Sequence, residues 1–246
     1  MARWQSSSRK EPVVPDYDTL WDEVYGDIQD VGPVHRHMRR LMREVLAPLS
    51  YETVLDVGVG FGHNLPVLTD ARSLTRVAGV DLSERALQHV RERWEGGDFL
   101  KLDIESETLE STFDLVCASL IMEHVIDDEA VLANLRALTS RYLLVVTIGG
   151  NFERYRPWED QMGHVRNYMV GELESKLTRA GFVVHRMIYW GFPFYSPLAR
   201  TLQNHMQATH EFNWFHRLMT HALYWLYFLN STRRGDLLIA LAGNRN

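Results

Sequence analysis

The residues with the clearest chemical pattern are an aspartate, Asp56, and three glycines at alternate positions, Gly58, Gly60 and Gly62. Glycine lets the backbone approach a ligand closely, and a helix that begins just after it offers N–H groups. The pattern therefore predicts a nucleotide cradle. The dinucleotide fingerprint needs glycine or alanine at position 63, where this chain has His63, and no Lys-Ser or Lys-Thr pair follows at P-loop spacing. An acidic residue before the glycines favours a ligand that carries a cation over a pyrophosphate.

Apolar runs typical of buried parallel strands place these residues at strand ends. The carboxylate of Asp81, which follows the second run, is positioned to accept hydrogen bonds from the two hydroxyls of a ribose. The alternative is that Asp81 is a turn residue. Ser83 is a candidate N-cap for a helix over residues 84–93. The predicted strands cover residues 54–57, 76–80, 98–102, 113–118, 142–147, 182–190 and 236–242.

The segment around Asp56 resembles motif I of the class I S-adenosylmethionine (SAM) dependent methyltransferases, and the resemblance extends over residues 51–181 through four matching strand ends. It implies an α/β fold with a seven-stranded, mostly parallel sheet, helices on both faces, and an antiparallel seventh strand between the fifth and sixth. It implies SAM as cofactor, with Asp103 accepting from the adenine amino group beside Ile104. The implied cofactor-binding residues are Asp56, Gly58, Gly60, Gly62, Asn64, Asp81, Leu82, Asp103, Ile104 and Ser119.

Two histidines are candidate general bases. His124 lies in a Glu-His-Val segment that looks like the family's segment after strand four, and His164 lies in a Gly-His-x-Arg-x-Tyr block that resembles one in small-molecule methyltransferases. The alternatives are a backbone hydrogen bond that holds the loop of His124, and a 149–168 segment tied down by an Arg–Glu pair and aromatic packing. We expect no metal, since no cluster of closely spaced His, Asp and Glu appears after strands four and five. The candidate substrate-binding residues are Tyr25, Arg166, Tyr168, Phe192 and Phe194.

The predicted organisation is an N-terminal helical cap over residues 1–50 and a SAM-binding domain over residues 51–246. The cap either pads the sheet edge or covers the cofactor cleft. A helical insertion at about 191–235, rich in aromatic residues, separates the last two strands, with helices expected over about 198–210 and 215–229. A loop of this length is usually functional or has structure of its own. We favour a lid over an apolar acceptor; a homodimer interface and packing on the sheet edge are the alternatives.

The charge, cysteine count and apolar segments of the chain exclude some classes of protein. The net charge of −6 argues against a nucleic-acid partner held by phosphate contacts. The single cysteine, Cys117, is expected in the core and leaves no intrachain disulfide, so a cytoplasmic location is expected. The N-terminus has no apolar signal region, and no window has the apolar length of a transmembrane segment.

The sequence predicts methyl transfer from SAM to a small-molecule acceptor, as in small-molecule biosynthesis. The aromatic insertion favours an aromatic or largely apolar acceptor, methylated on oxygen or nitrogen. The alternatives are a non-catalytic SAM-binding or scaffold protein of the same fold, and a nicotinamide-dependent oxidoreductase, which His63 opposes. Titration with NADH and with SAM separates the last alternative from the other two.

Overall fold

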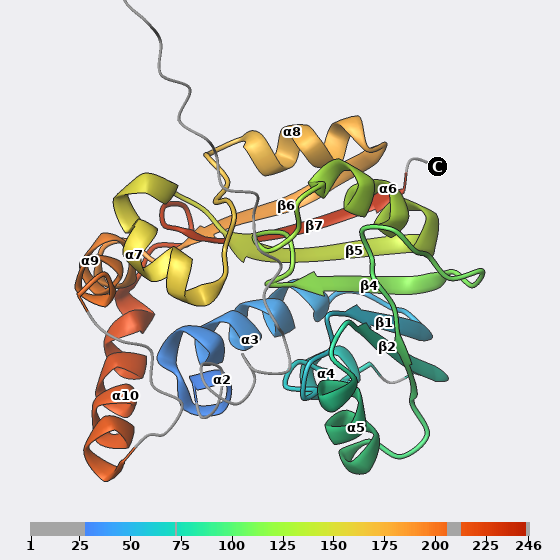
Figure 1. Cartoon of the computed structure of the whole chain (residues 1–246), viewed down its shortest axis with the longest axis horizontal. Helices are drawn as coiled ribbons and strands as arrows, with labels where there is room; N and C mark the ends of the chain where they lie inside the picture. Colours follow the sequence, from blue (N-terminus) through green and yellow to red (C-terminus); the bar gives the residue numbers. More distant parts are fainter. Residues whose placement is uncertain (1–27, 72, 206–212, 245–246) are drawn as a thin grey trace, which may run out of the picture.

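The computed structural model describes residues 28–71, 73–205 and 213–244; residues 1–27, with the candidate substrate residue Tyr25, lie outside that part. Its core is a seven-stranded sheet with the strand order β3-β2-β1-β4-β5-β7-β6 (Figure 1). The strands from β3 to β5 are parallel, and β7 runs antiparallel between β5 and β6, which confirms the predicted fold class. The strands are β1 (Thr53–Val57), β2 (Arg76–Asp81), β3 (Asp98–Lys101), β4 (Phe113–Ser119), β5 (Thr139–Ile148), β6 (Phe182–Trp190) and β7 (Leu237–Asn244).

Helices cover both faces of the sheet because its central strands are apolar on both sides. Apolar residues of α6 and α8 pack on one face, and those of α3 and α4 pack on the other. The helices in chain order are α2 (Ile28–Val31), α3 (Pro33–Leu46), α4 (Leu65–Leu68), α5 (Glu84–Arg93), α6 (Asp128–Leu138), α7 (Phe152–Met162), α8 (Glu172–Arg179), α9 (Arg200–Gln203) and α10 (Trp214–Leu226), with a π-helical turn η2 (Phe194–Ala199) and a 3₁₀ turn η3 (Tyr227–Leu229).

The arrowheads of β4 and β5 point to the left in Figure 1, toward α7, α9 and α10. These helices therefore lie near the carboxyl ends of the parallel strands, where open α/β sheets bind their ligands. None of the helices within residues 28–71, 73–205 and 213–244 has the length and apolar character needed to cross a membrane.

Local sequence determines most element boundaries. The predicted helix over residues 84–93 is α5, and the Ser83 side chain caps it by accepting from the backbone N–H of Ala86 at 3.0 Å. Cys117 is fully buried in β4, as expected. The polar segment after β5 contains α7, which Asn151 caps. Of the helix expected over 198–210, residues 198–203 are helical in η2 and α9, and residues 206–212 lie outside the described part. Ser196, which precedes Pro197, has the extended φ of −121° and ψ of 116° that a residue before proline favours, and helical residues follow it.

Candidate active site

The glycine loop after β1 has the backbone of a ligand cradle. Gly58, Gly60 and Gly62 have φ angles of 70°, 53° and 80°, in the left-handed region that glycine adopts most readily. A Cβ atom on Gly58 would lie 1.9 Å from Cδ1 of Ile121, so a side chain at that position collides with its neighbour. The Gly60 N–H donates to Oδ2 of Asp81 at 2.8 Å, which ties the loop to the end of β2. The glycines therefore let the loop pack closely against Ile121 and adopt the φ angles that bring its backbone to the cavity.

A cavity of about 700 Å³ extends from the glycine loop to the insertion between β6 and β7. It collects residues that are far apart in the sequence, because the ends of β1, β2, β4 and β5 meet at one edge of the sheet. The predicted cofactor residues that line it are Gly58, Gly60, Asn64, Asp81, Leu82, Asp103, Ile104 and Ser119.

Two predicted cofactor residues, Asp56 and Gly62, do not line this cavity. Asp56 is fully buried in β1, in register with Cys117 on β4, and burial raises the pKa of its carboxyl well above the usual value, with the Cys117 thiol acting against the rise. Gly62 faces α5, where an added Cβ would lie 2.9 Å from Val90. Both residues lie behind the cavity wall in this structure, and their part in cofactor binding stays a prediction.

Two acidic side chains in the cavity wall are held by hydrogen bonds. Asp81 accepts from the backbone N–H groups of Gly60 at 2.8 Å and Ser83 at 2.9 Å. Asp103 accepts from the N–H of Glu105 and the hydroxyl of Ser106, each at 3.0 Å. The backbone thus fixes the direction of each carboxylate before any ligand binds.

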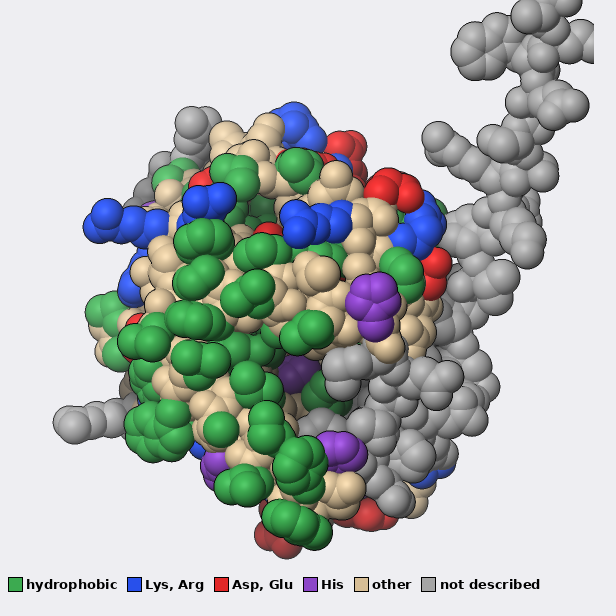
Figure 2. All heavy atoms as spheres, turned by 90° about the vertical axis from the view of Figure 1, so that its left-hand side faces the viewer, with side chains coloured by type: hydrophobic (Ala, Val, Ile, Leu, Met, Phe, Trp, Pro, Cys, Tyr) green, Lys and Arg blue, Asp and Glu red, His purple; other side chains and the backbone are tan. Residues whose placement is uncertain are grey.

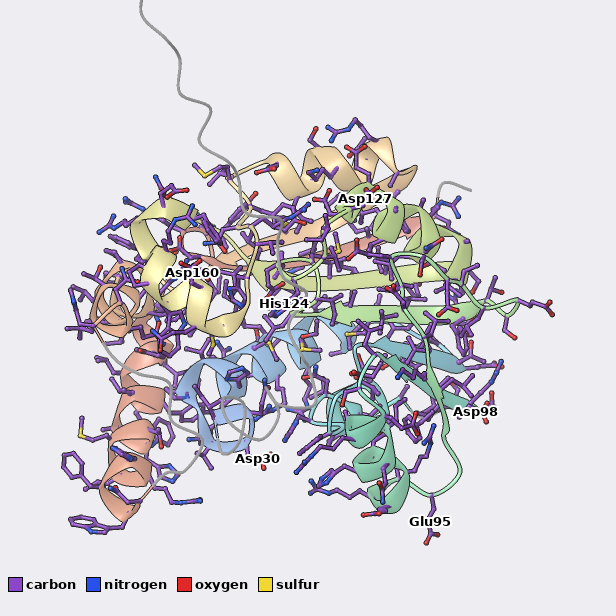
Figure 3. The ribbon with its side chains drawn as sticks, in the orientation of Figure 1. Asp30, Glu95, Asp98, His124, Asp127 and Asp160 are labelled. Atoms are coloured by element: carbon purple, nitrogen blue, oxygen red, sulfur yellow. The ribbon has the colours of Figure 1, made fainter. Side chains whose placement is uncertain are left out.

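Three further side chains meet in the wall of the cavity. Glu123, His124 and His164 each offer one ligand-type atom, and these atoms all lie within 4.8 Å of one another. Figure 3 shows His124 near the centre of the molecule, whereas Glu95 and Asp98 point outward from its edge. Such a cluster was not expected from the sequence, because 39 residues separate His124 from Gly163, the neighbour of His164. The return of the chain through α7 brings the two histidines together.

Glu123 is the buried member of this cluster. Its Oε2 accepts from the Thr147 hydroxyl at 2.8 Å, and both residues are fully buried. Its Oε1 is also buried and has no hydrogen-bond partner within the described ranges. Burial raises the pKa of the Glu123 carboxyl, and the neighbouring His164 acts against the rise. Glu123 was not among the predicted site residues, although its place beside His124 after a strand was an available signal.

His124 is oriented by the backbone. Its Nδ1 lies 3.1 Å from the carbonyl oxygen of Gly163, and since a carbonyl only accepts, Nδ1 carries the proton and Nε2 is the basic nitrogen. Burial, with a further contribution from His164, lowers the pKa of His124 to about 3. The imidazole is therefore neutral at pH 7. His124 therefore both holds its loop through a hydrogen bond to the backbone and lines the cavity.

His164 is oriented by a buried carboxylate. Its Nδ1 lies 2.5 Å from Oε2 of Glu159 on α7, and the other oxygen of Glu159 accepts from Arg200 and, at 2.9 Å, from Asn167. Burial raises the pKa of Glu159, but the hydrogen bond from His164 and the charge of Arg200 outweigh burial and lower it. The alternative of an Arg–Glu pair within residues 149–168 is met by the exposed pair Arg156–Glu153 on α7. Glu159 pairs with Arg200, an arginine of the insertion.

Three candidate substrate residues lie away from the cavity. The Tyr168 hydroxyl donates to Asp128 at 2.8 Å, and Arg166 pairs with the same carboxylate at 2.8 Å. The Phe192 ring lies under the guanidinium of Arg234, 4.1 Å from ring centroid to Cζ. These contacts hold the three side chains away from the cavity in this structure, and of the described candidates only Phe194 lines it. The predicted role of Arg166, Tyr168 and Phe192 in substrate binding stays a prediction.

The insertion forms the outer wall of the cavity. Apolar side chains from η2, α9, α10 and η3 line it, including Phe194, Leu198, Leu202, Leu223 and Tyr227. Apolar side chains also gather on the outer surface of this region, which faces the viewer in Figure 2. The large exposed side chains of α10 are Trp214, Phe215, Leu218, Met219, Trp225 and Leu226.

The fold and the glycine cradle together define a class I methyltransferase domain. The profile of the methyltransferase domain family matches residues 34–186, which is more than half of the chain, and the chain belongs to this family. Members of the family use SAM as methyl donor, and solved neighbours carry SAM or S-adenosylhomocysteine.

The proteins to which this chain is similar share 30% or less of its sequence in the three comparisons that follow. Trans-aconitate 2-methyltransferase of Agrobacterium fabrum is 30% identical over 118 residues, and the match spans about half of each protein, 46% in both cases. A chain of the complex between the Haloferax volcanii Trm112 methyltransferase activator and a methyltransferase superposes with a TM-score of 0.64 at 17% identity, over 95% of this chain and 100% of that one. Magnesium protoporphyrin IX methyltransferase of Synechocystis PCC 6803 gives 0.54 at 15% identity, over 87% and 86%. These structural likenesses concern the fold alone.

Proposed function

We propose that this chain transfers the methyl group of SAM to a small-molecule acceptor. The observation that carries the proposal is one continuous cavity that joins the glycine cradle and Asp81 to the Glu123, His124 and His164 cluster. SAM, when bound, supplies a methyl group on a sulfonium, which an aligned nucleophile can displace. The protein's own task is to orient the acceptor and keep water away.

The residues of the cradle fit a nucleoside. Gly58 and Gly60 line the cavity with their backbone in the left-handed region, and Asp81 presents a fixed carboxylate at the end of β2 for the ribose hydroxyls. Asp103 and Ile104 line the adjoining part of the cavity, where we place the adenine. Asp56 supports this arrangement from behind the loop.

The lining supports an aromatic or largely apolar acceptor. Most side chains that the insertion contributes to the cavity are apolar, and the described residues that line it include no lysine or arginine. A tricarboxylate such as the trans-aconitate named for the Agrobacterium relative would find no lysine or arginine among the described lining residues to balance its charges. We therefore place the acceptor between the histidine cluster and the wall formed by Leu198 and Leu223.

In this proposal the two histidines act on the hydroxyl proton that an acceptor loses when it is methylated on oxygen. His164, whose Nδ1 faces the Glu159 carboxylate, is the candidate that accepts the proton of a hydroxyl acceptor, since the carboxylate stabilises the charged imidazole. His124, which burial keeps neutral, is suited to accept a hydrogen bond at Nε2 and so to orient that hydroxyl. An amine that is already neutral needs no base, so the same site accommodates methylation of oxygen or nitrogen.

The test is formation of S-adenosylhomocysteine from SAM by the purified chain. Aromatic hydroxyl compounds and aromatic amines form one arm of an acceptor panel, and di- and tricarboxylates form the other. Methylated product in the aromatic arm alone is the expected result. Product only with carboxylates overturns the acceptor class, while SAM binding without turnover on any acceptor, including a small-molecule extract, supports the non-catalytic alternative.

A further inference from the structure

The Glu123, His124 and His164 cluster has the composition of a metal centre. Two imidazoles and one carboxylate are the ligands that many proteins use for first-row divalent metals, with open positions left for substrate. The three ligand-type atoms come within 4.8 Å of one another in the described structure. Metal–ligand bonds of about 2.0–2.2 Å place neighbouring ligand atoms about 3 Å apart, so small side-chain rotations complete the site.

Both imidazoles are held in the way that metal-binding histidines are. In metal sites the ring nitrogen that does not bind metal usually donates to a carboxylate or a backbone carbonyl. Here Nδ1 of His124 donates to the Gly163 carbonyl at 3.1 Å, and Nδ1 of His164 faces the Glu159 carboxylate at 2.5 Å. In each ring the contact at Nδ1 assigns the proton to Nδ1 and the lone pair to Nε2.

Glu123 provides the independent observation that points to a cation. Its side chain is 0% exposed, yet its Oε1 has no hydrogen-bond partner among the residues described. A buried carboxylate oxygen without a partner is costly and calls for a compensating group. Thr147 fixes the other oxygen at 2.8 Å, so Oε1 is directed by a rigid strand residue and lies in the wall of the cavity.

We propose that Glu123, His124 and His164 bind one divalent transition-metal cation in the wall of the cavity. Mn²⁺, Fe²⁺, Co²⁺ and Zn²⁺ fit the two nitrogen ligands, whereas Mg²⁺ and Ca²⁺ prefer oxygen ligands throughout. The remaining coordination positions face the cavity and are open to an oxygen atom of an acceptor. The proposal goes beyond methyl transfer, because metal binding needs neither SAM nor acceptor. In the metal-loaded protein the histidine lone pairs are engaged, and the cation takes over their role in making an acceptor hydroxyl more acidic.

The direct test is a titration of the EDTA-treated full-length chain with Mn²⁺, with the free ion followed by electron paramagnetic resonance. We expect one bound Mn²⁺ per chain and at least about tenfold weaker binding in Glu123→Gln and in His164→Asn. Glu123→Gln keeps an oxygen that can accept from Thr147, so its fold is preserved. His185→Asn, which changes an exposed histidine of β6, is the matched control and leaves binding unchanged.

A second measurement needs no variant. Pulsed electron paramagnetic resonance of Mn²⁺ bound to the wild-type chain detects nitrogen nuclei of coordinated imidazoles. Couplings from two imidazoles are the expected spectrum. No Mn²⁺ binding at millimolar concentration, binding that Glu123→Gln leaves unchanged, or a spectrum without nitrogen couplings overturns the metal site. SAM titration of the same protein is a separate readout, so failure of the metal site and failure of the proposed methyltransferase remain distinguishable.

Discussion

Nδ1 of His164 lies 2.5 Å from Oε2 of Glu159, and this contact connects the candidate active site with the insertion between β6 and β7. The second oxygen of Glu159 accepts from Arg200, the first residue of α9. Arg200 is 2% exposed and also donates to the carbonyl of Gly149 at 2.7 Å and to Asp236 at 2.8 Å. A substitution in the insertion can therefore alter the position of His164 through only two side chains, those of Arg200 and Glu159.

Arg200→Met tests this connection through stability. The substitution leaves the Glu159 and Asp236 carboxylates without their cation, and the loss of one partner of a buried ion pair costs about 3–5 kcal/mol. Urea unfolding at pH 7 measures the change. Arg154→Met, on the exposed side of α7, is the control and is expected to change the free energy of unfolding by less than about 0.5 kcal/mol. Equal effects of the two variants would remove the special role of Arg200.

His124→Asn and His164→Asn test the catalytic roles of the two imidazoles. Whether a histidine acts as base or as metal ligand, its loss is expected to lower kcat by roughly 10²–10⁴-fold. SAM affinity, measured by calorimetry, should stay within a few-fold of wild type, since the predicted nucleoside contacts are elsewhere in the cavity. The exposed His185→Asn again provides the control. If both variants turn over at nearly the wild-type rate, catalysis depends on positioning alone.

Leu198→Gln tests the insertion as a wall of the acceptor site. Leu198 lines the cavity and is 56% exposed, so the substitution is tolerated by the fold while it makes the wall polar. We expect KM for an apolar acceptor to rise by roughly tenfold, which corresponds to the burial of about two methylene groups. Leu218→Gln on α10, a site 58% exposed that does not line the cavity, is the matched control. An equal KM in both variants would place the acceptor elsewhere.

Asp128→Asn is expected to reduce stability in a pH-dependent way. Burial raises the pKa of Asp128, but hydrogen bonds from Lys176, Arg166 and Tyr168 outweigh burial, and the folded-state pKa is lowered. A lowered pKa contributes stability above the unfolded-state value, and that contribution disappears as the pH falls through the folded-state value. Urea unfolding should therefore show a loss of about 2 kcal/mol at pH 7 that shrinks below about pH 4. A loss that is independent of pH would show that charge is not its cause.

The parallel sheet was predictable from the sequence because its signals are local. The apolar run before Asp56 and the capping hydroxyl of Ser83 each act within a few residues, and β1 and α5 appear where those signals predict them. The kind of binding loop was also predictable from the sequence, because glycine adopts the positive φ angles of such a loop at low cost and the three alternating glycines have them.

The candidate site was predictable only in part, because its remaining contacts are between distant segments. Glu159 and Arg200 are 41 residues apart, and no local sequence pattern around either residue indicates that they form an ion pair. Tyr168 and Arg166 are residue types that often bind substrates, yet in the structure both side chains bind the Asp128 carboxylate. In the sequence Asp128 is recognisable only as the start of a helix. Sequence pattern locates strand ends, whereas tertiary packing decides which side chains there face the cavity.

The measurement that tests the central claim most directly is calorimetric titration of SAM into wild-type protein and into Asp81→Ala. The claim is that the cavity beside the glycine loop binds SAM through the Asp81 carboxylate. Hydrogen bonds to a charged group contribute about 1.5–3 kcal/mol, so we expect Asp81→Ala to bind roughly 10- to 100-fold more weakly. The exposed Asp98→Ala on the neighbouring strand should bind as wild type does, and NADH should not bind at all. Unchanged SAM affinity in a folded Asp81→Ala protein, or no SAM binding by the wild type, would contradict the account.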